Sequence, residues 1–261
     1  MKFKIYQVDA FAEKVFEGNP AAVVPLQAWP EEVIMQQIAA ENNLSETAFY
    51  VKKDNVVEIR WFTPTIEVDL CGHATLATAH VLYKHEGFVG NEINFHSHRT
   101  GALAVRQTET GLQLDFPVDQ IVQVALSEEL TAGVMPKPQE IWRGKSDYLF
   151  VFEKESDISD LTYDLNQIAK IEARGIAVTA PGKEKDFVSR FFGPQSGVPE
   201  DPVTGSAHTT LMPYWTKVLG KKTLTARQIS PRGGNLTCSL VGERVLITGN
   251  AVTYLIGEIQ L

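Results

Sequence analysis

The sequences EVDLCGHA at residues 67–74 and EDPVTGSA at residues 200–207 decide the fold, because they are two copies of one local pattern. In each copy an acidic loop leads to a glycine, after which an apolar helix is expected. An arginine followed by aromatic residues precedes each copy, as RWFTP at 60–64 and as RFFGP at 190–194. The second half of the chain is therefore expected to repeat the fold of the first.

Sequence outside these two copies follows the same repeat. The offset of 133 positions between the two glycines also carries Leu103 onto Leu236 and Leu112 onto Val245, all within short apolar runs. Many short strands and one long apolar helix per half predict an α+β fold rather than a parallel doubly wound sheet. A helix that is apolar almost all round is expected to be buried within a strongly curved sheet.

Duplication predicts two similar lobes that are related by a pseudo-two-fold axis, with a cleft between them. We place the N-terminal lobe at residues 1–117 and the C-terminal lobe at residues 118–261, with the terminal strand able to pack back on the first lobe. Two repeats are too few for a solenoid, which needs at least about three.

Composition excludes several classes of protein. The 261 residues carry 24 basic and 32 acidic side chains, a net charge of −8, so we expect no nucleic-acid partner. The longest run without a charged side chain is Pro202–Thr216, which is shorter than the roughly 20 residues of a membrane span. Two widely separated cysteines form neither a disulfide framework nor a zinc ribbon. We expect a cytoplasmic protein without membrane contact.

The two glycine-led helix starts are candidate binding sites for a small anionic substrate. Unpaired N–H groups at a helix N-terminus attract carboxylate or phosphate, and glycine lets a ligand approach the backbone. On this reading the helix starts at Gly72 and Gly205 bind a carboxylate or phosphate group of a small anionic substrate. The alternative is that both glycines only turn the chain and that Ser206 caps its helix.

Glu46 is the candidate acid–base residue. It stands at the entry of an apolar strand, where a glutamate is usually a solvated edge residue. At the offset of 130 its counterpart is Ile176, so only one lobe offers a carboxylate at this position. This asymmetry favours a chemical role for Glu46 in proton transfer.

His73 and Asp201 are further candidates, each with a structural alternative. The position of His73 near a helix N-terminus is expected to favour the neutral imidazole, which can orient a substrate or relay a proton. The alternative is that His73 only packs against or caps the first helical turn. Asp201 either holds a polar group of the ligand or forms an Asx turn with Pro202. Without a Gly-x-Ser-x-Gly motif, Ser206 with these two residues is weak support for a hydrolase triad. Phosphate-loop and dinucleotide motifs are absent too.

The motifs SETAF at 45–49, CGHA at 71–74 and EDPVTGSA at 200–207 resemble the three signatures of the PhzF-like isomerases, a family related to phenazine biosynthesis. The opening VDAF at 8–11 and GNPAAV at 18–23 resemble the start of that family, so the likeness spans essentially the whole chain. The resemblance implies the diaminopimelate-epimerase-like fold, in which each lobe is a β-barrel around a central helix. It also implies a homodimer that needs neither a metal nor an organic cofactor.

The resemblance also implies roles for individual residues. It makes Glu46 the group that moves a proton between carbon atoms of a carboxylate-bearing substrate, assisted by His73, Asp201 and Ser206. The glycines at the two helix starts would hold the substrate carboxylate, and Cys71 and Thr204, which precede them, are assigned to substrate binding.

Two other functions stay open from the sequence. Related epimerases use one cysteine at each helix start, but here Thr204 stands opposite Cys71 in the repeat, which argues against a two-thiol racemase. A racemase or epimerase with Cys71 as its only thiol is one alternative. A non-catalytic protein that binds a small molecule in the same cleft is the other.

Overall fold

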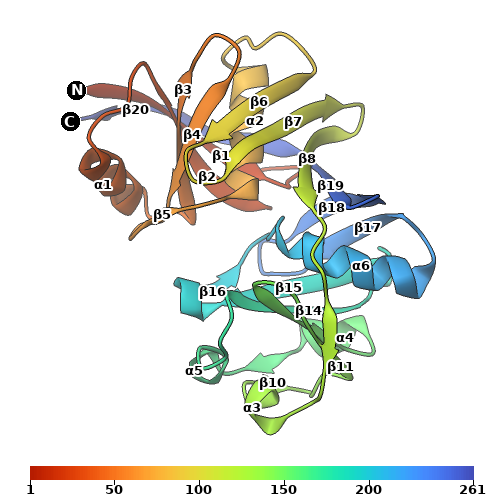
Figure 1. The fold of residues 1–261 in the computed structure, drawn as a ribbon. Helices are drawn as coiled ribbons and strands as arrows, with labels where there is room; N and C mark the ends of the chain where they lie inside the picture. Colours follow the sequence, from red (N-terminus) through yellow and green to blue (C-terminus); the bar gives the residue numbers. More distant parts are fainter. The chain divides into compact units, whose positions relative to one another are not determined.

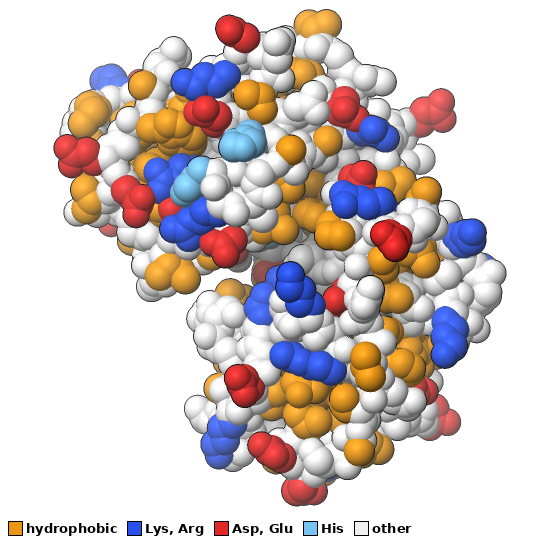
Figure 2. All heavy atoms as spheres, in the orientation of Figure 1, with side chains coloured by type: hydrophobic (Ala, Val, Ile, Leu, Met, Phe, Trp, Pro, Cys, Tyr) orange, Lys and Arg blue, Asp and Glu red, His pale blue; other side chains and the backbone are white.

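The computed structural model describes all residues from Met1 to Leu261 as two compact units of a mixed α+β fold. The first unit combines Met1–Asp115 with Thr248–Leu261, and the second comprises Phe116–Ile247. None of the helices has the length and apolar character that a membrane span requires. Figure 2 shows acidic and basic side chains interspersed over the visible face, so the net charge of −8 does not form one acidic patch there.

The first unit is built around a long N-terminal strand, β1 (Lys2–Ala10). This strand pairs antiparallel with β2 (Asn19–Leu26) and with the last strand of the chain, β20 (Ala251–Gln260). The C-terminal residues therefore belong to the first unit (Figure 1). The other elements of this unit are β3 (Glu46–Lys52), β4 (Val57–Phe62), β5 (Glu67–Val68), β6 (Glu92–Ser97), β7 (Gly101–Thr108), β8 (Gly111–Pro117), α1 (Glu32–Asn42) and α2 (Gly72–Lys84).

Helix α2 is buried on nearly every side, as the apolar sequence predicts. Ten of its 13 residues are buried, and it packs against β1, β2, β3, β7 and β20. The hydroxyls of Thr75 and Thr78 donate hydrogen bonds of 2.6 and 2.7 Å to the carbonyls of Cys71 and Ala74. Polar side chains can therefore lie in this apolar environment because the helix backbone accepts their hydrogen bonds.

The second unit has more short elements and one long helix, α6 (Ala207–Leu219), which packs against three of its strands. Its strands are β9 (Val122–Val124), β10 (Val134–Met135), β11 (Glu140–Arg143), β12 (Asp147–Val151), β13 (Thr162–Tyr163), β14 (Gly175–Pro181), β15 (Phe187–Gly193), β16 (Val198–Asp201), β17 (Thr223–Gln228), β18 (Gly234–Val241) and β19 (Arg244–Gly249). Its short helices are α3 (Glu128–Thr131), α4 (Glu155–Ser159), α5 (Leu165–Ile168) and the 3₁₀ helix η1 (Pro194–Ser196).

Strand pairing within each unit repeats the same pattern. In the first unit β4 is antiparallel to β3 and β5 and parallel to β6. In the second unit β15 is antiparallel to β14 and β16 and parallel to β17. Each central strand then leads, through its short partner strand, to a 13-residue helix. The duplication expected from the sequence is therefore present in the topology.

An arginine–glutamate pair joins the central strand to its short partner in both units. In the first unit Arg60 donates two hydrogen bonds of 2.7 Å to Glu67. In the second unit Arg190 donates bonds of 2.7 and 2.9 Å to Glu200. Both pairs belong to the repeated motifs from which the duplication was inferred, so the repeat retains an interaction as well as a backbone path.

The burial of His208 in α6 is expected to make the stability of the second unit depend on pH. Its side chain is completely buried, its Nδ1 lies 3.0 Å from the carbonyl oxygen of Thr204, and burial lowers the pKa of its imidazole from 6.5 to about 4. The unfolded chain therefore takes up a proton that the folded chain excludes. The contribution of this group to the free energy of unfolding is fully present above pH 6.5, and about 3 kcal/mol of it is lost between pH 6.5 and pH 4.

We expect His208→Gln, which cannot titrate, to show a smaller loss of melting temperature between pH 8 and pH 4.5 than the wild type. Thermal unfolding at the two pH values measures the difference. An equal loss in both proteins would contradict the assignment to His208. His80, whose pKa burial also lowers to about 4, titrates in both proteins and cancels from the comparison.

Candidate active site

Glu46 and His73 form a close, largely buried pair in the first unit. Glu46 is the first residue of β3 and lies opposite Ala21 in the parallel pairing with β2, while His73 is the second residue of α2. The Oε2 atom of Glu46 lies 3.1 Å from the Nε2 atom of His73, and their side chains are 15% and 7% exposed. The start of a strand and the start of a helix thus bring together two residues that the sequence analysis selected separately.

Two more side chains complete this cluster. Cys71, the residue before α2, places its Sγ atom 3.5 Å from Nδ1 of His73. The amide of the fully buried Asn19 lies 3.2 Å from the same ring nitrogen. Asn19 was not among the residues predicted from the sequence, although the GNPAAV motif that contains it was one part of the family resemblance. We call Asn19, Glu46, Cys71 and His73 the four-residue cluster.

Charge within the cluster reverses one expectation. Burial lowers the pKa of His73, but the charges and hydrogen bonds of Cys71 and Glu46 outweigh it, and the pKa is raised well above its usual value. Burial, and then the charge of Glu46, raises the pKa of the Cys71 thiol. The prediction of a neutral imidazole was wrong, because it considered the helix N-terminus and not a carboxylate at 3.1 Å.

The repeat has no second carboxylate at the position of Glu46. By strand register the counterpart of this residue is Gly175 and not Ile176, because Thr47 lies opposite Phe62 just as Ile176 lies opposite Phe192. A side chain at Gly175 would meet the Phe191 ring and a backbone carbonyl at 2.6 Å. The asymmetry inferred from the sequence therefore holds, with the equivalent position shifted by one residue.

The second unit gathers the other candidate residues around the start of α6. Thr204 donates its hydroxyl to Asp201, and the backbone N–H of Thr204 donates to the side chain of Gln228 at 2.8 Å. The Gln228 amide in turn donates to the backbone carbonyl of Asp201 at 2.6 Å. Gln228 thus fixes the loop that carries both candidates, and it was not among the residues predicted from the sequence.

Ser206 is held by a residue that the sequence did not indicate. It is the N-cap residue of α6, but its hydroxyl makes no capping hydrogen bond and instead accepts one of 2.9 Å from Arg174. Arg174 also donates from Nε and Nη2 to the two carboxylate oxygens of the buried Asp147, the bond from Nε being 2.8 Å. The alternative in which Ser206 only caps the helix is therefore not what the structure contains.

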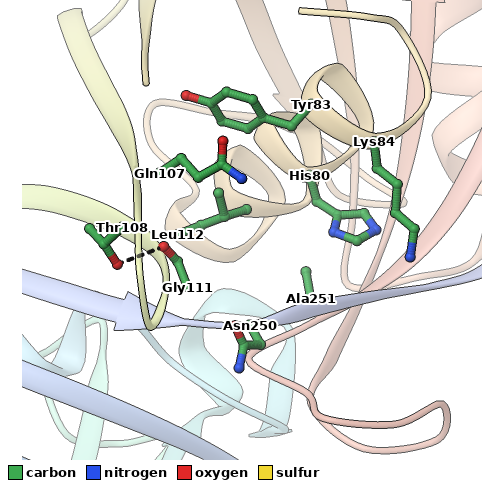
Figure 3. Close-up of a pocket in the computed structure, with 9 residues that line it drawn as sticks. All are labelled: His80, Tyr83, Lys84, Gln107, Thr108, Gly111, Leu112, Asn250 and Ala251. Atoms are coloured by element: carbon green, nitrogen blue, oxygen red, sulfur yellow. Dashed lines mark hydrogen bonds between the residues drawn. The ribbon is translucent and has the colours of Figure 1, made fainter. Parts of the chain in front are cut away.

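A separate cavity of about 350 Å³ lies in the first unit beside the C-terminal half of α2 (Figure 3). Its lining comes from α2, the β7–β8 hairpin and the start of β20: His80, Tyr83, Lys84, Gln107, Thr108, Gly111, Leu112, Asn250 and Ala251. No residue of the four-residue cluster lines it. The four-residue cluster and this cavity are therefore distinct features of the first unit.

Comparison with known proteins shows one consistent likeness. Residues 8–257 match the family model described as phenazine biosynthesis-like protein. An uncharacterized isomerase of Pseudomonas aeruginosa is 48% identical over 261 residues, covering all of both chains. A crystal structure of a PhzF-family phenazine biosynthesis protein from Enterococcus faecalis superimposes with a TM-score of 0.97 at 46% identity, again over both whole chains.

A more distant likeness concerns the fold alone. A hydroxyproline epimerase from Agrobacterium vitis matches with a TM-score of 0.62 at 10% identity, covering 99% of this chain and 92% of the epimerase. The mixed α+β architecture is thus shared with an epimerase whose amino acids differ from those of this chain at most aligned positions.

Proposed function

The chain belongs to the phenazine biosynthesis-like (PhzC-PhzF) family, and from this premise we propose that it is a cofactor-independent isomerase of a small carboxylate-bearing substrate. In this proposal Glu46 takes a proton from one carbon atom and returns it to another on the same face. The observation that carries the proposal is the largely buried contact of 3.1 Å between Glu46 and His73. The name isomerase, given to its relative from Pseudomonas aeruginosa, agrees with this reaction class.

Glu46 and His73 have different roles in the proposed reaction. In this proposal Glu46 accepts the proton from the substrate, and the raised pKa of His73 keeps the neighbouring imidazole protonated. Proton abstraction leaves the electron pair on the substrate, where conjugation spreads it until Glu46 delivers the proton to the second carbon. Donors close to the substrate would stabilise the charge that develops in between.

We propose that the remaining candidates bind and orient the substrate. The N–H groups at the glycine-led starts of the two long helices, at Gly72 and Gly205, would hold the carboxylate. Asp201 and Ser206 would assist by hydrogen bonding, and Thr204 with them. Support for Asp201 and Ser206 comes from their ordered partners in the second unit, Gln228 and Arg174.

We also propose that each unit is the β-barrel around a central helix that the family resemblance implies, and that the protein is a cytoplasmic homodimer. The burial of α2 against five strands supports the first part of this proposal.

Proton NMR in D₂O tests the reaction class directly. A panel of small amino and hydroxy carboxylates, with dihydro-hydroxyanthranilate among them, is incubated with the wild-type protein. We expect deuterium incorporation or isomerisation of at least one compound. A compound that binds the protein, as measured by calorimetry, and never exchanges would favour the non-catalytic binding protein instead.

One observation favours a second candidate, a racemase or epimerase that uses Cys71. The Sγ atom of Cys71 lies 3.5 Å from His73, within reach of proton exchange with the imidazole. Burial and the Glu46 charge raise the pKa of this thiol, which disfavours the thiolate that such an enzyme needs.

We therefore expect Cys71→Ser to keep its rate of deuterium exchange within about tenfold of the wild type, since the serine hydroxyl retains the size and hydrogen bonding of the thiol. The same NMR measurement checks this. Complete loss of exchange in Cys71→Ser, with exchange kept in Glu46→Gln, would support the racemase and contradict the role of Glu46.

A further inference from the structure

We propose that Glu46, Cys71 and His73 bind one thiophilic divalent cation, such as Zn²⁺, and that the bound ion inhibits the enzyme. The binding part of this inference rests on the geometry of the four-residue cluster alone. The inhibition part also rests on the proposed function, because it requires Glu46 to be the acid–base residue.

The three donor atoms lie close enough together for one ion to reach all of them after a side-chain rotation. One donor atom from each of the three residues lies within 4.8 Å of the other two. The Nε2 atom of His73 is 3.1 Å from Oε2 of Glu46 and 4.0 Å from Sγ of Cys71. Tetrahedral zinc, with bonds of about 2.0 to 2.3 Å, places its donor atoms roughly 3.3 to 3.6 Å apart. The Nε2–Oε2 contact fits this spacing, whereas Sγ lies 3.5 Å from Nδ1 and would reach the ion after rotation of the Cys71 side chain towards Nε2.

The donor types fit zinc as well as the distances do. A thiolate, an imidazole and a carboxylate are all ordinary zinc ligands, and three protein ligands leave a fourth position for water. Binding replaces the thiol proton of Cys71 and the Nε2 proton of His73 with bonds to the ion. Both protons pass to solvent, and no electron is transferred.

Asn19 supplies the outer partner that a histidine ligand needs. When Nε2 of His73 binds a metal, Nδ1 carries the hydrogen and requires an acceptor. The amide of Asn19 lies 3.2 Å from Nδ1, and its nitrogen and oxygen exchange places when the amide turns by 180°. Turned in this way, the amide oxygen accepts from Nδ1 and fixes the ring with Nε2 directed at Glu46 and the ion.

Inhibition follows from the occupation of Glu46. A carboxylate bound to zinc has given one of its oxygen lone pairs to the ion and is a weaker base for a carbon acid. The ion also removes the Nε2 proton that links His73 to Glu46. A bound cation would therefore stop proton transfer without unfolding the unit.

Metal binding is tested with the cation alone, so its outcome does not depend on whether a substrate is known. Zn²⁺ is titrated into the reduced protein against a chromophoric chelator, and Co²⁺ is titrated separately with absorption spectroscopy. We expect one Zn²⁺ per chain and a sulfur-to-cobalt charge-transfer band. In Cys71→Ser the band should disappear and the affinity for Zn²⁺ should fall at least ~100-fold.

Two further variants keep this test decisive. In Glu46→Gln we expect affinity to fall about tenfold while the sulfur-to-cobalt band remains, because the thiolate is intact. Cys238→Ser, a change at the other buried cysteine, should bind Zn²⁺ like the wild type. Circular dichroism of each variant checks that it is folded. Equal affinity of Cys71→Ser and the wild type, or a cobalt spectrum without the band, would overturn the metal site.

Inhibition is tested separately with a compound that exchanges deuterium. One equivalent of Zn²⁺ should lower the exchange rate at least tenfold, and excess EDTA should restore it. A wild-type protein that binds Zn²⁺ and exchanges at its full rate would overturn the inhibition. A protein that binds Zn²⁺ and exchanges no compound would contradict the proposed function and leave the metal site in place.

Discussion

Replacing Glu46 by glutamine should lower kcat for proton exchange by about 10³-fold and leave KM within a few-fold of the wild-type value. General acid–base groups contribute roughly 10²- to 10⁴-fold, and an amide cannot accept the proton. Glutamine keeps the size and the polarity of the side chain, so it can still contact His73 at the start of α2. A KM that stays nearly constant while kcat collapses is expected of a group that acts in the transition state.

The matched control is Glu41→Gln, the same substitution five positions earlier at an exposed residue of α1. We expect its rate of deuterium exchange to equal that of the wild type. Thermal unfolding of both variants shows whether the mutated chains are folded. A Glu46→Gln protein that is folded and exchanges at more than a tenth of the wild-type rate would remove Glu46 from the mechanism.

The duplication was predictable because it is encoded by local pairs of residues. An arginine on a strand and a glutamate on the following loop are close in the chain, and they keep their spacing in both halves to within three positions. Each pair forms its bidentate contact in the structure. Features of this kind depend on short segments and on strand periodicity, which sequence patterns record directly.

The partners of the candidate residues were harder to predict. Asn19 contacts His73 across 54 positions, and Arg174 contacts Ser206 across 32. Each contact requires two separate elements to pack in one register, and a single sequence does not contain that register. The shift from Ile176 to Gly175 has the same origin, because the connection between β14 and β15 is one residue longer than the connection between β3 and β4.

Electrostatics set a further limit on the sequence analysis. The start of α2 was a sound reason to expect a neutral imidazole at His73, but a carboxylate at 3.1 Å has the opposite and larger effect. The direction of a pKa shift depends on which charges are nearest. That is known only after the strand carrying Glu46 and the helix carrying His73 have been placed against each other.

The largest loss of stability is expected from Glu200→Gln, at about 4 kcal/mol of the free energy of unfolding. The side chains of Arg190 and Glu200 are only 9% and 11% exposed, and the arginine also donates to the carbonyl of Ile158 at 2.9 Å. Removing the charge of Glu200 leaves a buried guanidinium without a counter-charge, which costs roughly 3 to 5 kcal/mol. Urea denaturation of the variant and the wild type measures the difference.

Two controls separate burial from the mere presence of a salt bridge. Glu258→Gln removes an exposed pair with Lys2, whose side chains are 47% and 66% exposed, and should cost less than about 0.5 kcal/mol. Glu67→Gln should fall between the two, because Arg60 keeps a second partner, Glu32, at 2.6 Å. The order Glu200, Glu67, Glu258 is the prediction, and equal losses at all three positions would contradict it.

A compensating change shows whether the uncompensated charge is the cause. In the background of Glu200→Gln, Arg190→Met removes the unpaired guanidinium and puts an apolar side chain of similar length next to the aromatic ring of Phe192, over which the guanidinium lies at 5.0 Å. We expect the double variant to regain at least half of the lost stability, because paired removal of buried charges is close to neutral in many proteins. If the double variant is less stable than Glu200→Gln, then Arg190 stabilises the unit mainly through its contacts with Ile158 and Phe192, and the loss in the single variant has another source.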